Sequence, residues 1–150
     1  MTHLKIGDQA PEINIKDQDG KTHQLADYKG KKLVLYFYPK DATPGCTAQA
    51  CNLRDNIPAL KKSGYEVLGV SADSEKSHQK FIEKQQLNFP LLADTEKELI
   101  QRYDVWGEKK FMGKTFDGIH RTTFIIDEQG KIADIITKVK TKEHTDQILK

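Results

Sequence analysis

The apolar residues of this chain gather in short runs bounded by lysine, glycine or proline, a pattern typical of strands buried inside a sheet. The strongest run, Leu33-Val-Leu-Tyr-Phe-Tyr38, should end at Pro39, because proline has no amide hydrogen to donate within a sheet. Similar runs predict further strands, and the last two pair across Glu128-Gln-Gly130. The predicted strands cover residues 33–38, 66–72, 91–92, 121–127 and 131–138.

The segments between these runs carry helical signals. Thr43 and Pro44 suit the N-cap and first position of a helix whose apolar stripe continues through Leu53 and Leu60. Pro58 should kink this helix or split it in two. Three further helices are expected to begin at Asp73 or Ser74, at the capping-box sequence Thr95-Glu-Lys-Glu98, and at Thr141.

Two remaining segments complete the predicted architecture. Residues 13–25 read as an N-terminal hairpin with Gly20 in its turn, and residues 104–120 read as a long loop. Strands that alternate with helices, followed by a hairpin and a closing helix, are typical of a thioredoxin-like α/β fold with a central mixed sheet flanked by helices. A length of 150 residues favours one domain over residues 1–150.

Charge adds little to this picture. The net charge is +2, from 24 basic and 22 acidic residues, so we expect no nucleic acid and no anionic membrane as a partner. The N-terminal residues have no apolar core of signal-peptide length, and no run approaches the roughly 18 apolar residues of a membrane span. We therefore expect a cytoplasmic protein.

The two cysteines, Cys46 and Cys51, both lie on the helix that follows Thr43. In a reducing compartment such a pair is more typical of redox catalysis or metal binding than of a structural disulfide. Metal binding is disfavoured because the histidines show no paired spacing, and we expect each of them at the surface. The alternative is that both cysteines are small buried residues of a core helix. The histidines are His3, His23, His78, His120 and His144.

The position of Cys46 in the first helical turn favours reactivity. A thiolate is the nucleophile, and a thiol with the ordinary pKa of about 8.5 is only about 3% ionised at pH 7. A helix start stabilises an anion by at most about 2 kcal/mol, so a cation has to add to it. Arg121, at the start of a predicted strand, could reach Cys46 from a neighbouring strand end. It could instead form a surface ion pair with Asp127 or Glu128.

The pattern Pro39-x-x-x-Thr43-x-x-Cys46 resembles the peroxiredoxin active-site signature. The longer string from Tyr36 to Cys51 resembles the peroxiredoxin Q branch, also called the bacterioferritin comigratory proteins. The likeness implies a thioredoxin-like fold and the reduction of hydrogen peroxide and organic hydroperoxides. It extends over nearly the whole chain, with further similar stretches at residues 67–71, 89–92, 106–110 and 118–127.

The resemblance also implies a role for each residue of the motif. Cys46 would be the peroxidatic cysteine, and Cys51 the resolving cysteine of an intramolecular disulfide. The Thr43 hydroxyl would hydrogen-bond the reacting oxygen, the Arg121 guanidinium would lie beside the sulfur, and Pro39 would shield the site. Thioredoxin or a similar dithiol would recycle a monomeric enzyme that needs no metal, haem, flavin or nucleotide cofactor.

Helix geometry sets a condition on that disulfide. Five residues along an ideal helix place two Cα atoms roughly 8–9 Å apart, whereas a disulfide needs about 4.4–6.8 Å. The first turn or more must therefore unwind before Cys46 and Cys51 can join. We expect a reduced form with the helix intact and an oxidised form that is locally unfolded.

Two other functions stay open at this point. One is a thiol–disulfide oxidoreductase acting on proteins, although such enzymes typically use a Cys-x-x-Cys spacing. The other is a non-catalytic thioredoxin-like binding module.

The roles of several neighbours are open too. Gln49 could orient Arg121 or lie on the helix surface. Trp106 and Phe116 could form an apolar wall near the peroxide, a docking surface or ordinary packing. The lysines at positions 109, 110 and 114 are expected to form a solvated face.

Overall fold

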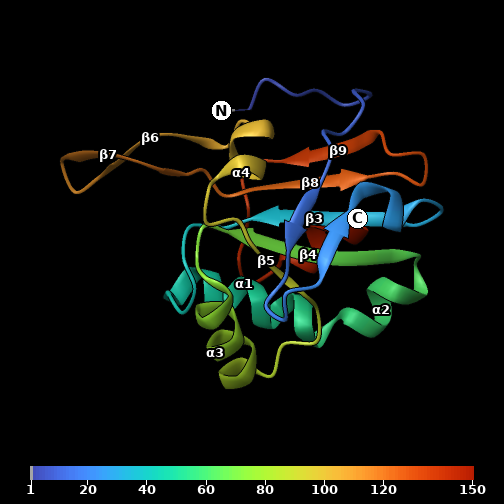
Figure 1. Ribbon diagram of the computed structural model, residues 1–150, viewed down its shortest axis with the longest axis horizontal. Helices are drawn as coiled ribbons and strands as arrows, with labels where there is room; N and C mark the ends of the chain where they lie inside the picture. The colour runs from blue at the N-terminus through green and yellow to red at the C-terminus, as the bar shows by residue number, and fades with distance from the viewer. Residues whose placement is uncertain (1) are drawn as a thin grey trace.

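A five-stranded mixed sheet forms the centre of the molecule in the computed structural model, which describes residues 2–150 (Figure 1). The three strands on one side are parallel to one another, and the next two are each antiparallel to their neighbours. This is the predicted thioredoxin-like arrangement. In spatial order the strands are β5 (Leu91–Ala93), β4 (Tyr65–Ser71), β3 (Lys32–Phe37), β8 (Thr122–Ile126) and β9 (Ile132–Ile136).

Strand β3 lies in the middle of the sheet and is buried on both faces, as its apolar sequence predicted. Leu35 and Phe37 point to one face, where they join a cluster that includes Phe124 of β8. Val34 and Tyr36 point to the other face and join the cluster that contains Cys46. The alternation of a strand thus puts Tyr36 on the same side of the sheet as the candidate nucleophile.

Helices cover both faces of the sheet. The first cluster is closed by α4 and by the N-terminal segment, and the second by the other four helices. The longest of these, α1, has 12 residues, against the roughly 20 that a membrane crossing needs, so no helix within residues 2–150 could span a bilayer. The helices are α1 (Pro44–Asp55), α2 (Ile57–Lys62), α3 (Glu75–Gln85), α4 (Glu98–Arg102) and α5 (His144–Leu149).

Several predicted boundaries are confirmed. The helix after Thr43 is divided into α1 and α2, and Pro58 lies in the first turn of α2, where its missing N–H costs no hydrogen bond. Ser74 caps α3 by accepting a hydrogen bond from the Ser77 backbone N–H at 3.1 Å. The N-terminal hairpin is formed by β1 (Asn14–Lys16) and β2 (Thr22–Gln24), and a short 3-10 helix (Leu25–Tyr28) follows it.

The capping-box prediction for α4 was wrong. The helix begins at Glu98, and its N-cap is Lys97 in a left-handed conformation (φ 59°), not Thr95. The buried carboxylate of Asp94 accepts a hydrogen bond from the Ile100 backbone N–H at 2.8 Å. The Asp94 side chain therefore accepts a first-turn hydrogen bond of the kind that the sequence pattern assigned to Thr95.

The start of α5 was also predicted too early. The helix begins at His144, not just after Thr141. Its first turn is fixed by α1, because the Asn52 side-chain oxygen accepts hydrogen bonds from the Thr145 backbone N–H and hydroxyl, both at 2.8 Å. A contact between residues so far apart in sequence leaves no local signal.

The predicted loop over residues 104–120 is instead a β-hairpin that projects from the body (Figure 1). Strands β6 (Trp106–Phe111) and β7 (Lys114–Ile119) pair antiparallel across Met112 and Gly113, which both have positive φ. Two positive φ values match the twist of a tight hairpin. Most of the arm is exposed, so its sequence lacks the apolar alternation that identifies a half-buried strand.

Gly69 offers a test of how tightly the second cluster is packed. It lies opposite Tyr36 in the β3–β4 pair, and an added Cβ would approach the Tyr36 ring to 2.9 Å and Leu91 to 2.7 Å. We expect Gly69→Ala to lower the free energy of unfolding by about 1–3 kcal/mol in urea titrations. Gly118→Ala is the control, because its Cβ would meet chiefly the flexible Lys109 side chain. Equal effects of the two substitutions would contradict the packing described.

Candidate active site

The loop between β3 and α1 places Cys46 in the first turn of a helix at the edge of the buried core. Pro39 ends the strand segment, Thr43 occupies the N-cap in an extended conformation, and Pro44 is the first helical residue. The Cys46 side chain is 1% exposed. The Thr43 hydroxyl donates to the Lys40 carbonyl at 3.0 Å and does not cap the first-turn amides. Cys46 therefore lies in the first turn, at the positive end of the helix, where the Thr43 side chain leaves the amides uncapped.

Arg121 reaches this sulfur from the neighbouring strand. It immediately precedes β8, which is antiparallel to β3, so the start of β8 lies beside the end of β3. Its Nη2 donates to Cys46 Sγ at 3.3 Å, and its Nη1 donates to Gln49 Oε1 at 2.6 Å. The surface ion pair considered as the alternative is not formed among residues 2–150. The guanidinium thus links the candidate nucleophile to a buried residue one turn along α1.

Gln49 and Lys109 complete the surroundings of the guanidinium. Gln49 is fully buried, so the surface alternative for this residue was wrong. Lys109 was expected in a solvated face, but its Nζ donates to the Ile119 carbonyl at 2.9 Å. Burial, followed by the positive charge of Arg121, lowers the pKa of Lys109. A second positive charge therefore lies near the site, and only the hairpin pairing, which the sequence did not indicate, brings it there.

Cys51 lies about one and a half turns further along α1, and the intact helix separates it from Cys46. Both cysteines are free thiols. Cys51 is half-buried, and its Sγ donates to Gln85 Oε1 at the end of α3, at 3.5 Å. The structure is thus the reduced form, with an undisturbed helix between the two sulfurs.

A buried polar network holds the loop that precedes Cys46. The Asp41 carboxylate accepts hydrogen bonds from Tyr38 Oη at 2.6 Å, from Ser77 Oγ at 2.8 Å and from His78 Nδ1 at 2.7 Å. The other nitrogen of His78 faces the Leu92 carbonyl at 2.9 Å. Because both ring nitrogens face acceptors, both carry hydrogen, and His78 forms a buried ion pair with Asp41.

This network shapes the backbone as well. The Asp41 N–H donates to Asp73 Oδ2 at 2.8 Å, and the next residue, Ala42, has a positive φ of 64°. Asp41, Asp73 and His78 bring possible metal-ligand atoms within 4.8 Å of one another. Their hydrogen bonds already engage both histidine nitrogens and both oxygens of Asp41, so we interpret the cluster as structural.

Three of the five histidines are buried, against the expectation that each lies at the surface. Both ring nitrogens of each have a hydrogen-bond partner within 2.9 Å. The partners of His23 lie within six residues of it, whereas His78 and the Nε2 of His144 are bonded by distant segments that a single sequence cannot identify. The three are His23, His78 and His144.

The two aromatic residues named for the loop have different surroundings. Trp106 is partly buried against the core cluster on the α4 face, and Lys97 Nζ lies 5.0 Å from its ring centroid. Phe116 is 48% exposed. Ordinary packing therefore describes Trp106, whereas a docking role for Phe116 stays a prediction.

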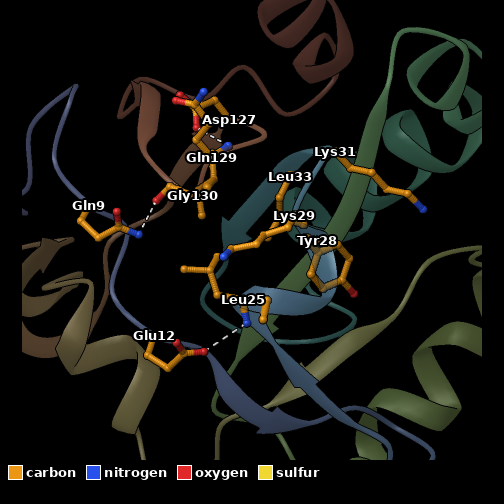
Figure 2. Close-up of a pocket in the computed structure, with 12 residues that line it drawn as sticks. Gln9, Glu12, Leu25, Tyr28, Lys29, Lys31, Leu33, Asp127, Gln129 and Gly130 are labelled. Carbon is orange, nitrogen blue, oxygen red and sulfur yellow. Dashed lines mark hydrogen bonds between the residues drawn. The ribbon is translucent and has the colours of Figure 1, made fainter.

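A cavity of about 270 Å³ lies at the other end of the central sheet (Figure 2). Leu33, at the start of β3, and Ile126, at the end of β8, form part of its wall, whereas Cys46 and Arg121 flank the opposite ends of these strands. The cavity is bordered by a hydrogen bond from Gln9 to the Gly130 carbonyl. Its lining contains no cysteine, so it is separate from the candidate active site.

Comparisons with known sequences agree on one family. A family model described as the AhpC/TSA family matches residues 6–135. "Peroxiredoxin Bcp" of Escherichia coli (strain K12) is 50% identical over 149 residues, which cover 99% of this chain and 96% of that protein. "Peroxiredoxin Bcp" of Bacillus subtilis (strain 168) is 47% identical over 146 residues, covering 97% and 93%.

Comparison with solved structures also finds similarity to proteins of this kind. The crystal structure of a Xylella fastidiosa PrxQ mutant has a TM-score of 0.90 and 34% identity, and the match covers 99% of this chain and 95% of that one. A Xanthomonas campestris bacterioferritin comigratory protein, studied for its alkyl peroxide reduction in trapped intermediate and ligand complexes, has a TM-score of 0.87 and 36% identity with the same coverage.

The Asp41–His78 pair makes a prediction about pH. Burial raises the pKa of Asp41, but the hydrogen bond and charge of His78, with the bonds from Tyr38 and Ser77, outweigh it and hold the pKa below its usual range. The stability that this carboxylate contributes is therefore fully present above the unfolded-state pKa of about 3.9 and is lost as pH falls through the lower folded-state value.

We expect Asp41→Asn to lower the free energy of unfolding by about 3 kcal/mol in urea titrations at neutral pH, because it leaves a buried cation unpaired. The difference from the unmodified protein should shrink below about pH 4. Asp134→Asn is the control, since that carboxylate pairs with the exposed Lys150, and asparagine can still accept the hydrogen bond from the Ile135 N–H. A difference that stays constant down to pH 3 would show that the Asp41 charge is not involved.

Proposed function

The chain belongs to the AhpC/TSA family, among the Bcp and PrxQ peroxiredoxins, and we propose that its thiol peroxidase activity resides in Cys46. The observation that carries this proposal is the 3.3 Å contact between Arg121 Nη2 and Cys46 Sγ at the start of α1. A guanidinium is permanently charged, so a sulfur that accepts its hydrogen bond is favoured as the anion. The family assignment decides against the two other functions considered from the sequence.

In the first step the Cys46 thiolate attacks the distal oxygen of a hydroperoxide. A sulfur lone pair forms the S–O bond, the O–O bond breaks, and the departing alkoxide or hydroxide takes up a proton to leave as alcohol or water. Arg121 and the first-turn amides stabilise the charge that moves onto the oxygens. The Thr43 hydroxyl, which donates to Lys40, can accept the hydroperoxide O–H through its lone pairs. Pro39 shields the reacting sulfur from the solvent side.

In the second step the Cys46 sulfenic acid is resolved by Cys51. The Cys51 sulfur attacks the sulfenic sulfur, the S–S bond forms, and the hydroxyl leaves as water. The helical separation of the two residues requires the start of α1 to unwind first. The part that unwinds ends before Asn52, because that side chain is held by α5 and the following turn is held by Arg54, whose Nη1 donates to the Gln85 carbonyl at 2.6 Å.

The third step returns the enzyme to its dithiol form. Thioredoxin or a similar dithiol attacks the disulfide and is itself oxidised, with a mixed disulfide as the intermediate. A reducing compartment such as the cytoplasm fits this cycle because it supplies the dithiol. That the chain is one domain, that it acts as a monomer, and that it binds neither nucleic acid nor membrane stay predictions.

Two cysteine variants test the assignment of roles. In a thioredoxin-coupled assay with hydrogen peroxide, Cys46→Ser should lose essentially all peroxide consumption, because a neutral hydroxyl is a poor nucleophile. Cys51→Ser should consume about one equivalent of peroxide per chain and then stop, because its sulfenic acid has no internal thiol to condense with. The intact protein should lose two hydrogens in mass after one equivalent of peroxide.

Two results of the coupled assay would contradict the roles assigned to the cysteines. Steady turnover by Cys46→Ser would remove Cys46 from the peroxide step. Unimpaired thioredoxin-dependent turnover by Cys51→Ser would mean that another thiol resolves the intermediate. A double variant lacking both cysteines is the background control.

A further inference from the structure

Tyr36 of β3 and Tyr38, which immediately follows that strand, differ in one respect that the sequence does not reveal. Tyr36 and Tyr38 belong to the same buried cluster, each is 1% exposed, and their rings stack with centroids 5.4 Å apart. The Tyr38 hydroxyl donates to Asp41 at 2.6 Å. The Tyr36 hydroxyl has no hydrogen-bond partner within residues 2–150. Buried hydroxyls are almost always paired, so the exception calls for a physical reason.

The unpaired hydroxyl belongs to the core beneath the start of α1. Tyr36 shares its buried cluster with Cys46 and Ala50 of that helix. Burial raises the pKa of Tyr36, so its hydroxyl stays protonated and is a donor without an acceptor. The space for the Tyr36 ring is provided by Gly69, across the β3–β4 pair.

A second unpaired donor lies in the same place. Gln49 is fully buried and uses its Oε1 to accept from Arg121, but its Nε2 has no partner within the described residues. Gln49 thus lies within residues 44–51, and Tyr36 lies in the buried cluster to which Cys46 and Ala50 of that stretch contribute. This is the stretch that has to unwind before Cys46 and Cys51 can join.

We propose that the unpaired Tyr36 hydroxyl biases residues 44–51 toward unwinding and so sets the rate at which oxidised Cys46 reaches Cys51. A buried donor without an acceptor has lost its hydrogen bond to water and regained none. When the start of α1 lifts away, water reaches the Tyr36 hydroxyl and the Gln49 amide, and the lost hydrogen bonds are recovered. The inference rests on the proposed function, because it concerns the resolving step of that cycle.

The consequence is a choice between two fates of the sulfenic acid. Condensation with Cys51 releases water and gives a disulfide that a dithiol can reduce. Attack on a second hydroperoxide transfers another oxygen to the sulfur, releases an alcohol or water, and gives a sulfinic acid. Fast unwinding favours the first outcome, so the Tyr36 hydroxyl protects the enzyme from inactivation by its own substrate.

Tyr36→Phe tests the proposal, because it removes the hydroxyl and keeps the ring. We expect the reduced variant to melt about 2–4 °C higher than the unmodified protein. After a pulse of one equivalent of hydrogen peroxide, rapid quenching and mass analysis should show disulfide formation slowed about five- to tenfold. Peroxide consumption in the first turnover should be unchanged. At excess peroxide the sulfinic acid fraction should rise.

Tyr38→Phe is the matched control, because its ring stacks on that of Tyr36 just after the end of β3. It removes a paired hydroxyl, so it should lower the melting temperature and should not slow disulfide formation. Amide hydrogen exchange over residues 44–51 of the reduced protein provides a second measurement. It should be slower in Tyr36→Phe and not slower in Tyr38→Phe.

The proposal is overturned if Tyr36→Phe forms the disulfide at the unmodified rate, or if it melts at or below the unmodified temperature. Unchanged amide exchange over residues 44–51 would overturn it as well. These outcomes differ from a failure of the proposed function, in which the unmodified protein itself would not consume the peroxide pulse through Cys46.

Discussion

The contact between the Arg121 guanidinium and the Cys46 sulfur is the interaction on which the other features of the site depend. It joins residues 75 positions apart in sequence, and only the sheet brings them together. Phe37 at the end of β3 is paired with Thr122 at the start of β8, so the loop leading to α1 and the residue preceding β8 meet at one edge. Shifting this register by one residue would send Arg121 to the other face.

The surroundings of Cys46 have to satisfy two conflicting demands. The reaction with peroxide needs a sulfur held rigidly beside the guanidinium, and the Asp41–His78 pair and Gln49 provide that rigidity. The resolving step needs the same segment to come apart. The structure separates these demands along α1, because the helix from Asn52 onward is tied to α5 and α3 while its first two turns cover two unpaired donors.

The sequence predicted those parts of the fold whose signals are local. The apolar run of β3, the Pro39 stop and the Thr43-Pro44 helix start depend on neighbouring residues, and the structure has them within one residue. The β6–β7 hairpin was missed because its strands face solvent and carry no alternating pattern. The start of α4 was misplaced because Asp94, outside the recognised motif, binds the helix.

The residues of the active site also divide into those with a local sequence signal and those without one. Cys46, Thr43 and Pro39 lie within eight residues, and the motif points to them directly. The Arg121 contact was inferred from strand ends together with the family resemblance. Lys109 and His78 could not have been found, because each meets its partners through pairing or packing of distant segments. Lys109 and His78 have no motif or strand-end position in the sequence that would indicate these contacts.

The central claim is that the Arg121 guanidinium makes the Cys46 sulfur reactive. Its most direct test is the second-order rate constant of the first step with hydrogen peroxide, measured by stopped flow in the Cys51→Ser background. Replacing Arg121 by methionine should lower this constant about 100-fold or more, and lysine, which cannot contact Cys46 and Gln49 together, should restore only part of it. A methionine variant that reacts within about threefold of its parent would contradict the account.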